Sequence, residues 1–209
     1  MIREAPSPFV FVGNHRALDF VNTEMASEGM PVDLLRGVTD LVAWLERSGG
    51  IDHGTAETAL ERWGAGRRGE KLLSAARSLR TDLKHMADAA AEGRPVPRAA
   101  LERVNRILAR GGAFVEVVAR PSGGFAERRG QQVRKPKDLL VPIAEAAGDL
   151  LCHADLKRVR RCAHPACVLY FLDGTKNGTR RWCDMRTCGN RANAAAYYRR
   201  RRTGDPPRS

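Results

Sequence analysis

The sequence predicts an α+β protein: a mainly helical N-terminal domain with a small antiparallel sheet, followed by a small C-terminal module built from a hairpin and a helix. Apolar residues recur at three- and four-residue steps through much of the chain before residue 153, as in helices that face a core. Two short apolar runs, at 9–12 and 113–118, are typical of strands. The last quarter differs, because residues 157–209 carry 14 Lys and Arg against 3 Asp and Glu and hold four of the five cysteines.

The N-terminal domain begins with the first apolar run. Residues 9–12 predict a buried strand that ends at Gly13-Asn14, and residues 17–23 fit either a strand or a helix. Asp40 is placed to cap a helix that Gly49-Gly50 ends. The chain therefore enters its first helices within about 40 residues.

Helices dominate the middle of the sequence. Residues 55–63 predict a short helix, and a longer one runs from about Glu70 to Ala91. The apolar stripe of the longer helix is formed by Leu72, Ala76, Leu79, Leu83, Met86 and Ala90. A glycine and two prolines end it, and a further helix over 101–108 follows.

The second apolar run predicts a hairpin. A Pro-Ser-Gly-Gly turn separates the strand at 113–118 from a return strand at 125–129, and a helix over 138–152 comes next. The composition then changes to that of the basic module. We therefore expect three segments: an N-terminal domain at 1–155, a cysteine-bearing module at 156–204 and a disordered tail at 205–209.

The net charge of +12 indicates a polyanionic partner. No stretch approaches the roughly 18 uninterrupted apolar residues of a membrane span. The N-terminus lacks the cationic segment and long apolar run of a signal peptide, so we expect a cytoplasmic protein with no membrane contact. Disulfides are a poor interpretation of cysteines in that reducing compartment.

Two cysteine pairs in the basic module predict a metal site. Four residues separate Cys162 from Cys167, four separate Cys183 from Cys188, and fifteen lie between the pairs. Each pair closes a small turn, and the stretch between the pairs has the turn residues of a hairpin that would return Cys183 to Cys162. Four soft thiolates favour one structural zinc ion per chain and leave no open position for chemistry.

Other interpretations of these residues stay open. The four cysteines fit an iron–sulfur cluster by type, although not by the common spacings, and unrelated core cysteines are a further alternative. His164 lies inside the first pair and is read as a loop residue rather than a ligand. The fifth cysteine, Cys152, is read as a partly buried thiol on a helix.

A cationic helix follows the last cysteine. The sequence GNRANAAAYYRRRR opens a helix at Gly189-Asn190, and its alanines are small enough to allow close approach to a nucleic acid. The alternative is a solvated run of charges on a helix that packs only against the metal site. The predicted nucleic-acid contacts are Lys176, Arg180, Arg181, Arg191, Arg199, Arg200, Arg201 and Arg202.

The stretch from Arg160 to Arg191 resembles the CGNR zinc-finger family of bacterial proteins, whose tetrapeptide stands here as residues 188–191. The shared features include the four cysteines, Phe171-Leu172-Asp173 and Arg180-Arg181-Trp182. Gly174 and Lys176 depart from the more usual small hydroxylated residue and arginine. Lysine lacks the bidentate phosphate geometry of arginine, which weakens the prediction at position 176.

The ALDFVNT segment at 17–23, with the helix–hairpin–helix order after it, resembles the ABATE domain that precedes this finger in its relatives. The resemblance implies a stress-induced transcription regulator. Its finger would bind DNA, and its N-terminal domain would respond to a small-molecule or protein effector.

We therefore expect a zinc-dependent protein that binds duplex DNA and is not an enzyme. The main alternative is an RNA-binding or ribosome-associated zinc protein, with Tyr197, Tyr198 and Trp182 stacking on bases. A zinc module that binds only protein is a further alternative. In the N-terminal domain, Asp19 and Asn22 predict either a ligand site or a polar pair in the core.

Overall fold

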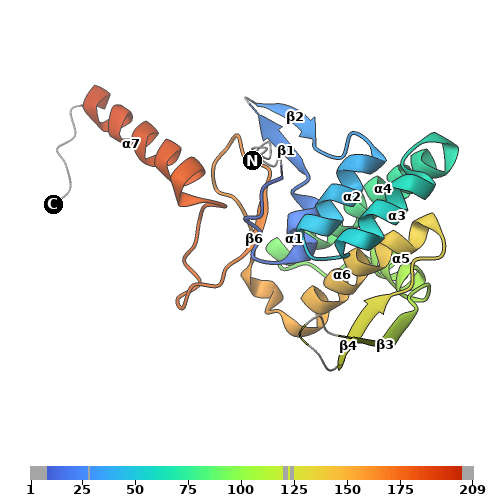
Figure 1. Cartoon of the computed structure of the whole chain (residues 1–209). Helices are drawn as coiled ribbons and strands as arrows, with labels where there is room; N and C mark the ends of the chain where they lie inside the picture. The colour runs from blue at the N-terminus through green and yellow to red at the C-terminus, as the bar shows by residue number, and fades with distance from the viewer. Residues whose placement is uncertain (1–8, 28, 120–121, 123–124, 204–209) are drawn as a thin grey trace.

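Seven α-helices and six strands make up the part of the chain that the computed structural model describes, which is residues 9–27, 29–119, 122 and 125–203. The predicted α+β class is confirmed (Figure 1). The N-terminal elements are α1 Arg16–Val21, β1 Glu24–Ser27, β2 Met30–Asp33, α2 Val38–Arg47, α3 His53–Trp63, α4 Gly66–Ala91, α5 Arg98–Leu108, β3 Ala113–Ala119, β4 Phe125–Gln131 and α6 Val141–His153. The C-terminal elements are β5 Val159–Arg161, β6 Tyr170–Leu172 and α7 Asn190–Thr203. The predicted tail at 205–209 lies outside the described residues.

The six strands form three separate antiparallel pairs. The β3–β4 pair confirms the predicted hairpin, with Ala113 opposite Gln131 and Ala119 opposite Phe125. The β1–β2 pair has no counterpart in the sequence prediction. The β5–β6 pair belongs to the cysteine-bearing module.

The strand predicted at 9–12 is wrong. These residues have no regular secondary structure, although the Phe9 side chain is buried in the core. Just after them, Gly13 accepts one hydrogen bond from Leu172 N–H at 2.8 Å. A strand needs a ladder of such bonds, and this segment lies against the C-terminal module without forming one.

The predicted helices are confirmed. Those predicted at 55–63, 70–91 and 101–108 start earlier, at His53, Gly66 and Arg98, whereas the one predicted at 138–152 starts later, at Val141, after a 3-10 turn over Pro136–Leu140. The ambiguous segment at 17–23 is helical and forms α1. In α2, Asp40 caps from inside the first turn, because its carboxylate accepts hydrogen bonds from Arg36 and Gly37 N–H, so the helix begins at Val38.

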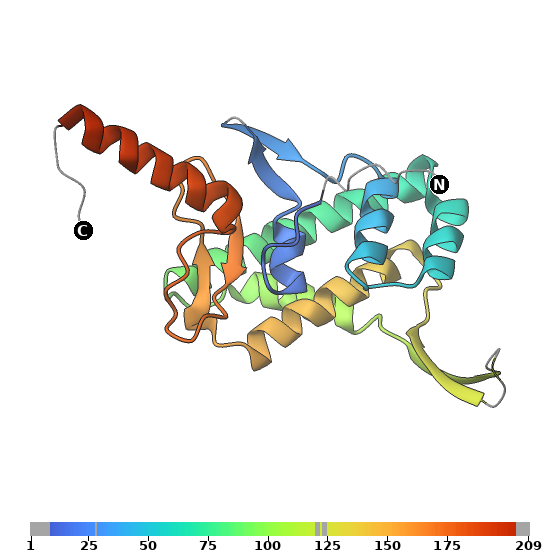
Figure 2. The same ribbon diagram turned by 60° about the vertical axis from the view of Figure 1, so that its left-hand side comes forward.

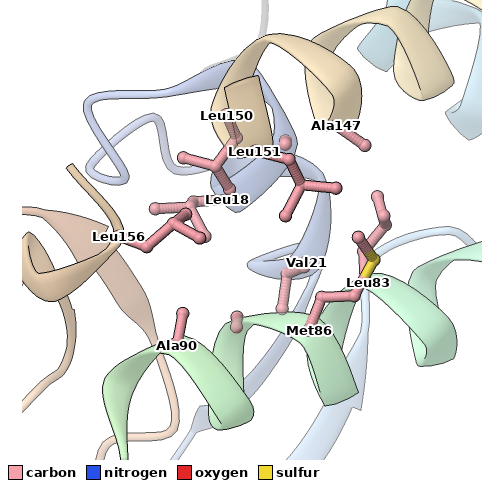
Figure 3. Close-up of a pocket in the computed structure, with 11 residues that line it drawn as sticks. Leu18, Val21, Leu83, Met86, Ala90, Ala147, Leu150, Leu151 and Leu156 are labelled. Carbon is pink, nitrogen blue, oxygen red and sulfur yellow. The ribbon is translucent and has the colours of Figure 1, made fainter. Parts of the chain in front are cut away.

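The centre of the core lies where α1, α4 and α6 meet. Figure 3 shows Leu18 and Val21 from α1, Met86 from α4 and Leu150 from α6 pointing toward one another. The cavity among them measures only about 10 Å³ and its lining is apolar, so it is a packing gap and not a ligand site.

A buried arginine attaches the β1–β2 hairpin to the long helix. Arg80 of α4, only 4% exposed, donates two hydrogen bonds of 2.7 Å to the two carboxylate oxygens of Asp33 and one of 3.0 Å to the Thr23 hydroxyl. Burial alone would raise the pKa of Asp33, but the hydrogen bonds from Arg80 and Leu35 N–H, together with the charges of Arg80 and Arg77, outweigh it and lower that pKa. The β1–β2 hairpin is thus held by the Arg80–Asp33 ion pair, which no local sequence pattern predicts.

The C-terminal module packs onto the helical body through β5 and β6. Val159 and Tyr170 are 0% and 1% exposed and belong to the main core. Asn22, after α1, donates to the carbonyl of Tyr170 and accepts from its N–H, both at 2.9 Å, and the Tyr170 hydroxyl donates to Asp88 at 2.5 Å. Beyond this junction α7 extends away from the body (Figures 1 and 2).

Candidate metal centre and basic helix

The first cysteine pair is held by the β5–β6 hairpin. Cys162 follows β5 directly, and its N–H donates to the Leu169 carbonyl at 2.9 Å. Cys167 lies in the loop before β6 and donates to the His164 carbonyl at 2.9 Å. The predicted hairpin is therefore present but in a different place: it encloses the first pair, whereas residues 173–182, which lead to the second pair, form no strand.

The chain returns to the site as a loop. Ala163 N–H donates to the Arg181 carbonyl at 2.9 Å, and Cys183 N–H lies 3.4 Å from the sulfur of Cys162. This returning segment forms no strand, because hydrogen bonds to the side chain of Asp173 hold it as a loop. Its carboxylate accepts from the Thr175 N–H and hydroxyl and from Arg180 N–H.

Asp173 was not predicted as a site residue, although it stands in the family stretch. It is 0% exposed. Burial alone would raise its pKa, but the hydrogen bonds from Thr175 and Arg180 outweigh it and lower that pKa. An acidic residue two positions before a threonine, at the start of a Gly- and Asn-rich loop, was the available signal for such an Asx turn.

The last cysteine lies in a helical turn. Residues Met185–Gly189 form one turn of π-helix that runs directly into α7, and the Asp184 carboxylate accepts from Thr187 N–H at 3.0 Å. The helical winding therefore starts four residues before the predicted opening at Gly189-Asn190. Cys188 is consequently part of the winding that continues as α7.

The four cysteine sulfurs fit one tetrahedral metal ion. All four lie within 4.8 Å of one another, with 3.7 Å between Cys167 and Cys183 and 3.6 Å between Cys183 and Cys188. Four sulfurs at about 2.3 Å from a central zinc ion stand about 3.8 Å apart. Cys162, Cys183 and Cys188 are buried and Cys167 is partly buried, so the donor set and its closed geometry suit a structural zinc.

Without metal the thiols share protons. The hydrogen bond from Cys167, followed by that from Cys183, lowers the pKa of Cys162. The same bond to Cys162 raises the pKa of Cys167 to about 12. Since zinc binds thiolates, loading the site releases these protons and makes zinc affinity fall at low pH.

The other two residues considered near this site are not ligands. His164 has its ring nitrogen 3.3 Å from Ala166 N–H, a loop role as predicted. Cys152 is apart from the cluster on α6 and is exposed, which corrects the prediction of partial burial.

Arg180, which was predicted as a nucleic-acid contact, makes several contacts within the fold. Its guanidinium donates to the carbonyls of Val12, Trp182 and Cys183, and it stacks on the Phe171 ring at 4.2 Å. It therefore ties the N-terminal segment to the metal loop through its Nε and one Nη group.

The remaining predicted contacts are on the surface. Lys176, Arg181 and Arg191 are exposed, and Arg181 lies over the Trp182 ring at 5.1 Å. On α7, Arg199, Arg200 and Arg201 are exposed, with Arg201 at 5.8 Å from the Tyr197 ring. The backbone of Arg202 belongs to α7, but its side chain lies outside the described residues.

Asp19 and Asn22 lie inside the fold. Asp19 accepts a hydrogen bond of 2.7 Å from Gly13 N–H, and Asn22 bonds to the backbone of Tyr170. Both therefore make the contacts of a polar pair in the core, which was one of the two interpretations of these residues.

The fold and the four-thiolate site define a zinc-finger protein whose finger is docked on a helical domain. Residues 14–154 match the ABATE family, described as "putative stress-induced transcription regulator", and residues 158–201 match the CGNR zinc finger. The chain belongs to the ABATE family and carries a CGNR finger after that domain, so both predicted resemblances are confirmed. No curated protein matches the chain significantly. Among the described residues, no helix has the length and apolar character to cross a membrane.

Proposed function

We propose that this protein is a zinc-dependent transcription regulator that binds duplex DNA through its finger and α7. The observation that carries the proposal is the continuous winding from Cys188 into α7, which presents exposed arginines on a helix that stands away from the body (Figure 2). A cationic helix of this kind suits contact with a duplex.

The exposed arginines of α7 fall into two groups according to their position along the helix. Arg199 to Arg201 lie near the free end of α7 and suit phosphate contacts that do not depend on sequence. Arg191 lies in the first turn of α7, and with Arg186 it lines a groove beside the cysteine cluster. We therefore assign site preference to Arg191 and general affinity to the later arginines.

Arginine variants test this assignment by fluorescence anisotropy. Arg181→Ala should weaken duplex binding while zinc content stays at about one per chain, because its side chain is exposed. Arg180→Ala should reduce zinc retention, because its guanidinium supports the loop that carries Cys183. If Arg181→Ala and zinc-free protein both bound duplex DNA as tightly as the native protein, the proposal would be wrong.

An RNA-binding role is the second candidate, and one observation favours it. Tyr197 and Tyr198 are 51% and 64% exposed, so their rings are accessible for base stacking. Changing both to alanine should reduce single-stranded RNA binding strongly if this role holds, and should change duplex binding little. Competition between the two nucleic acids at fixed salt decides between them.

We further propose that the protein is not an enzyme and that the ABATE domain modulates DNA binding. Four thiolates complete the coordination of zinc and leave no position for a substrate. The packing of Val159 and Tyr170 into the helical core supports transmission from that domain to the finger.

A further inference from the structure

A second concentration of positive charge lies on the ABATE domain, far from the finger. A pocket of about 450 Å³ opens between the end of α3, the start of α4 and the segment before α6. Figures 1 and 2 both show α3 and α7 at opposite ends of the molecule. The first 156 residues carry 22 Lys and Arg against 21 Asp and Glu, and this near-neutral total conceals an uneven distribution of charge.

The side chains that line this pocket are mostly cationic. Arg62, Arg68 and Lys71 come from α3 and α4. Arg134, Lys135 and Lys137 come from the other side. Trp63, Leu72 and Pro136 add apolar surface. Among the described residues, no acidic side chain lines the pocket.

Arg110 also lines the pocket and is neutralised by Asp138, but the other described cations around the pocket are not. Asp138, 8% exposed, is the nearby acid: it accepts from Arg110 at 2.9 Å and from the N–H groups of Arg134 and Lys135 at 3.1 and 2.8 Å. Its carboxylate thereby fixes the segment that presents Lys135. Within the described part of the chain, no carboxylate comes within ion-pair distance of Arg68, Lys71, Arg134, Lys135 or Lys137.

Local backbone structure adds to the positive potential. The N-cap of α4 is Ala65, which offers no side-chain hydrogen bond to the first turn, and Arg68 lies in that turn. The positive end of the helix dipole therefore has the same sign as the side chains around it. Gly69 lets α4 approach the end of α3 closely, because an added Cβ there would lie 2.4 Å from the Trp63 carbonyl oxygen.

We propose that this pocket binds a small molecule that carries two or more phosphate groups. Several unpaired cations around a concavity of one sign focus the potential on a compact, highly charged anion. The volume lies within the roughly 300–1,000 Å³ of small-molecule sites. Trp63, Leu72 and Pro136 would contact an apolar or planar body attached to the phosphates. A concave site suits a small polyanion better than the convex rod of a duplex.

Calorimetric titration of the full, zinc-loaded protein tests the proposal, with ATP, AMP, adenosine and inorganic triphosphate at constant ionic strength. ATP and triphosphate should bind, AMP more weakly and adenosine not detectably. Arg199–Arg202→Ala should retain this binding, which separates the pocket from the arginines of α7. Arg68→Ala/Lys71→Ala should weaken it about tenfold or more, through loss of two charge-assisted contacts.

The matched control is Arg67→Ala/Arg106→Ala, which removes two exposed charges of the same domain that do not line the pocket and should leave affinity unchanged. Lys135→Ala/Lys137→Ala tests the opposite wall and replaces the first variant if that one does not fold. The proposal is overturned if triphosphate binding follows the α7 arginines instead. It is also overturned if the Arg68→Ala/Lys71→Ala variant loses affinity only for duplex DNA and not for triphosphate. That result would make the pocket part of a nucleic-acid surface. DNA binding by the finger is not needed for either outcome.

Discussion

Asp19 carries a carboxylate in an interior position, 8% exposed, close to His15 and Arg180. Burial raises the pKa of Asp19 from 3.8 to about 6, and the hydrogen bond from Gly13, with smaller effects of the two nearby cations, only partly opposes it. The folded state therefore takes up a proton at a higher pH than the unfolded state does. The contribution of Asp19 to the stability of the folded protein is therefore fully present below the pKa that Asp19 has in the unfolded chain. It is lost as the pH rises through 6.

Lowering the pH from 7 to 5 should thus stabilise the native protein relative to Asp19→Asn by about 1.4 kcal/mol. Urea unfolding of both proteins at the two pH values measures this difference. Weaker zinc binding at pH 5 affects both proteins and cancels in the comparison. An equal change in both proteins would mean that Asp19 is already ionised at pH 5.

The Cys183 sulfur lies 3.7 Å from that of Cys167 and 3.6 Å from that of Cys188. Cys183→Ser should lose the bound zinc and disorder the metal loop, since site formation and folding of such a module are one process. Cys152→Ser is the matched control and should keep about one zinc per chain, because Cys152 is exposed and apart from the cluster. Elemental analysis decides, and iron in place of zinc would refute the choice of metal.

At the scale of elements, most of the described side chains of α7 are exposed, and the helix packs mainly on the π-helical turn from which it starts. Changing Arg199–Arg202 to alanine should weaken binding to all duplex sequences by a similar factor. Each lost phosphate contact should flatten the dependence of log affinity on log salt by about 0.9. Anisotropy titrations over a range of salt measure the slope, and an unchanged slope would show that these arginines do not contact phosphate.

The elements that could be predicted were those whose side chains repeat a periodic pattern. The apolar stripe from Leu72 to Ala90 predicted α4, and the turn between two strand-like apolar runs predicted the β3–β4 hairpin. The segment at 9–12 has the composition of a strand, but tertiary contacts with the finger decided its conformation. The β1–β2 hairpin depends on Arg80, which is far away in sequence.

The metal site followed from spacing, whereas the roles of the arginines did not. Four cysteines in two pairs suffice to indicate a tetrahedral site, wherever the hairpin lies. Arg180 and Arg181 are adjacent and look equivalent in sequence. Only the structure shows that the Arg180 guanidinium donates to three backbone carbonyls, whereas Arg181 is exposed.

At the scale of the whole molecule, the finger and the helical domain share a core. A fragment of residues 1–156 should still fold and should not respond to a chelator. It should be less stable than the zinc-loaded full chain, because Val159 and Tyr170 no longer cover the core. The expected difference in unfolding temperature is about 10 °C, corresponding to about 3 kcal/mol for a chain of this size.

Circular dichroism of the fragment and of the full chain, each with and without chelator, measures this coupling. The chelator should move the full chain toward the fragment, because the β5–β6 hairpin also encloses the first cysteine pair. A full chain whose unfolding temperature does not respond to the chelator would show two independent units.

The π-helical turn at Met185–Gly189 gives the zinc ion a mechanical role. Cys188 is part of the winding that becomes α7, so the metal–sulfur bond fixes one end of a rigid lever. The 14 residues of α7 span about 21 Å, and a rotation of about 10° at the cysteine would move its far end by about 4 Å. That displacement exceeds the spacing of neighbouring phosphates measured along the axis of a duplex, about 3.4 Å per strand. Small changes at the junction with the helical domain would therefore reach the far end of α7 as a shift of one phosphate position.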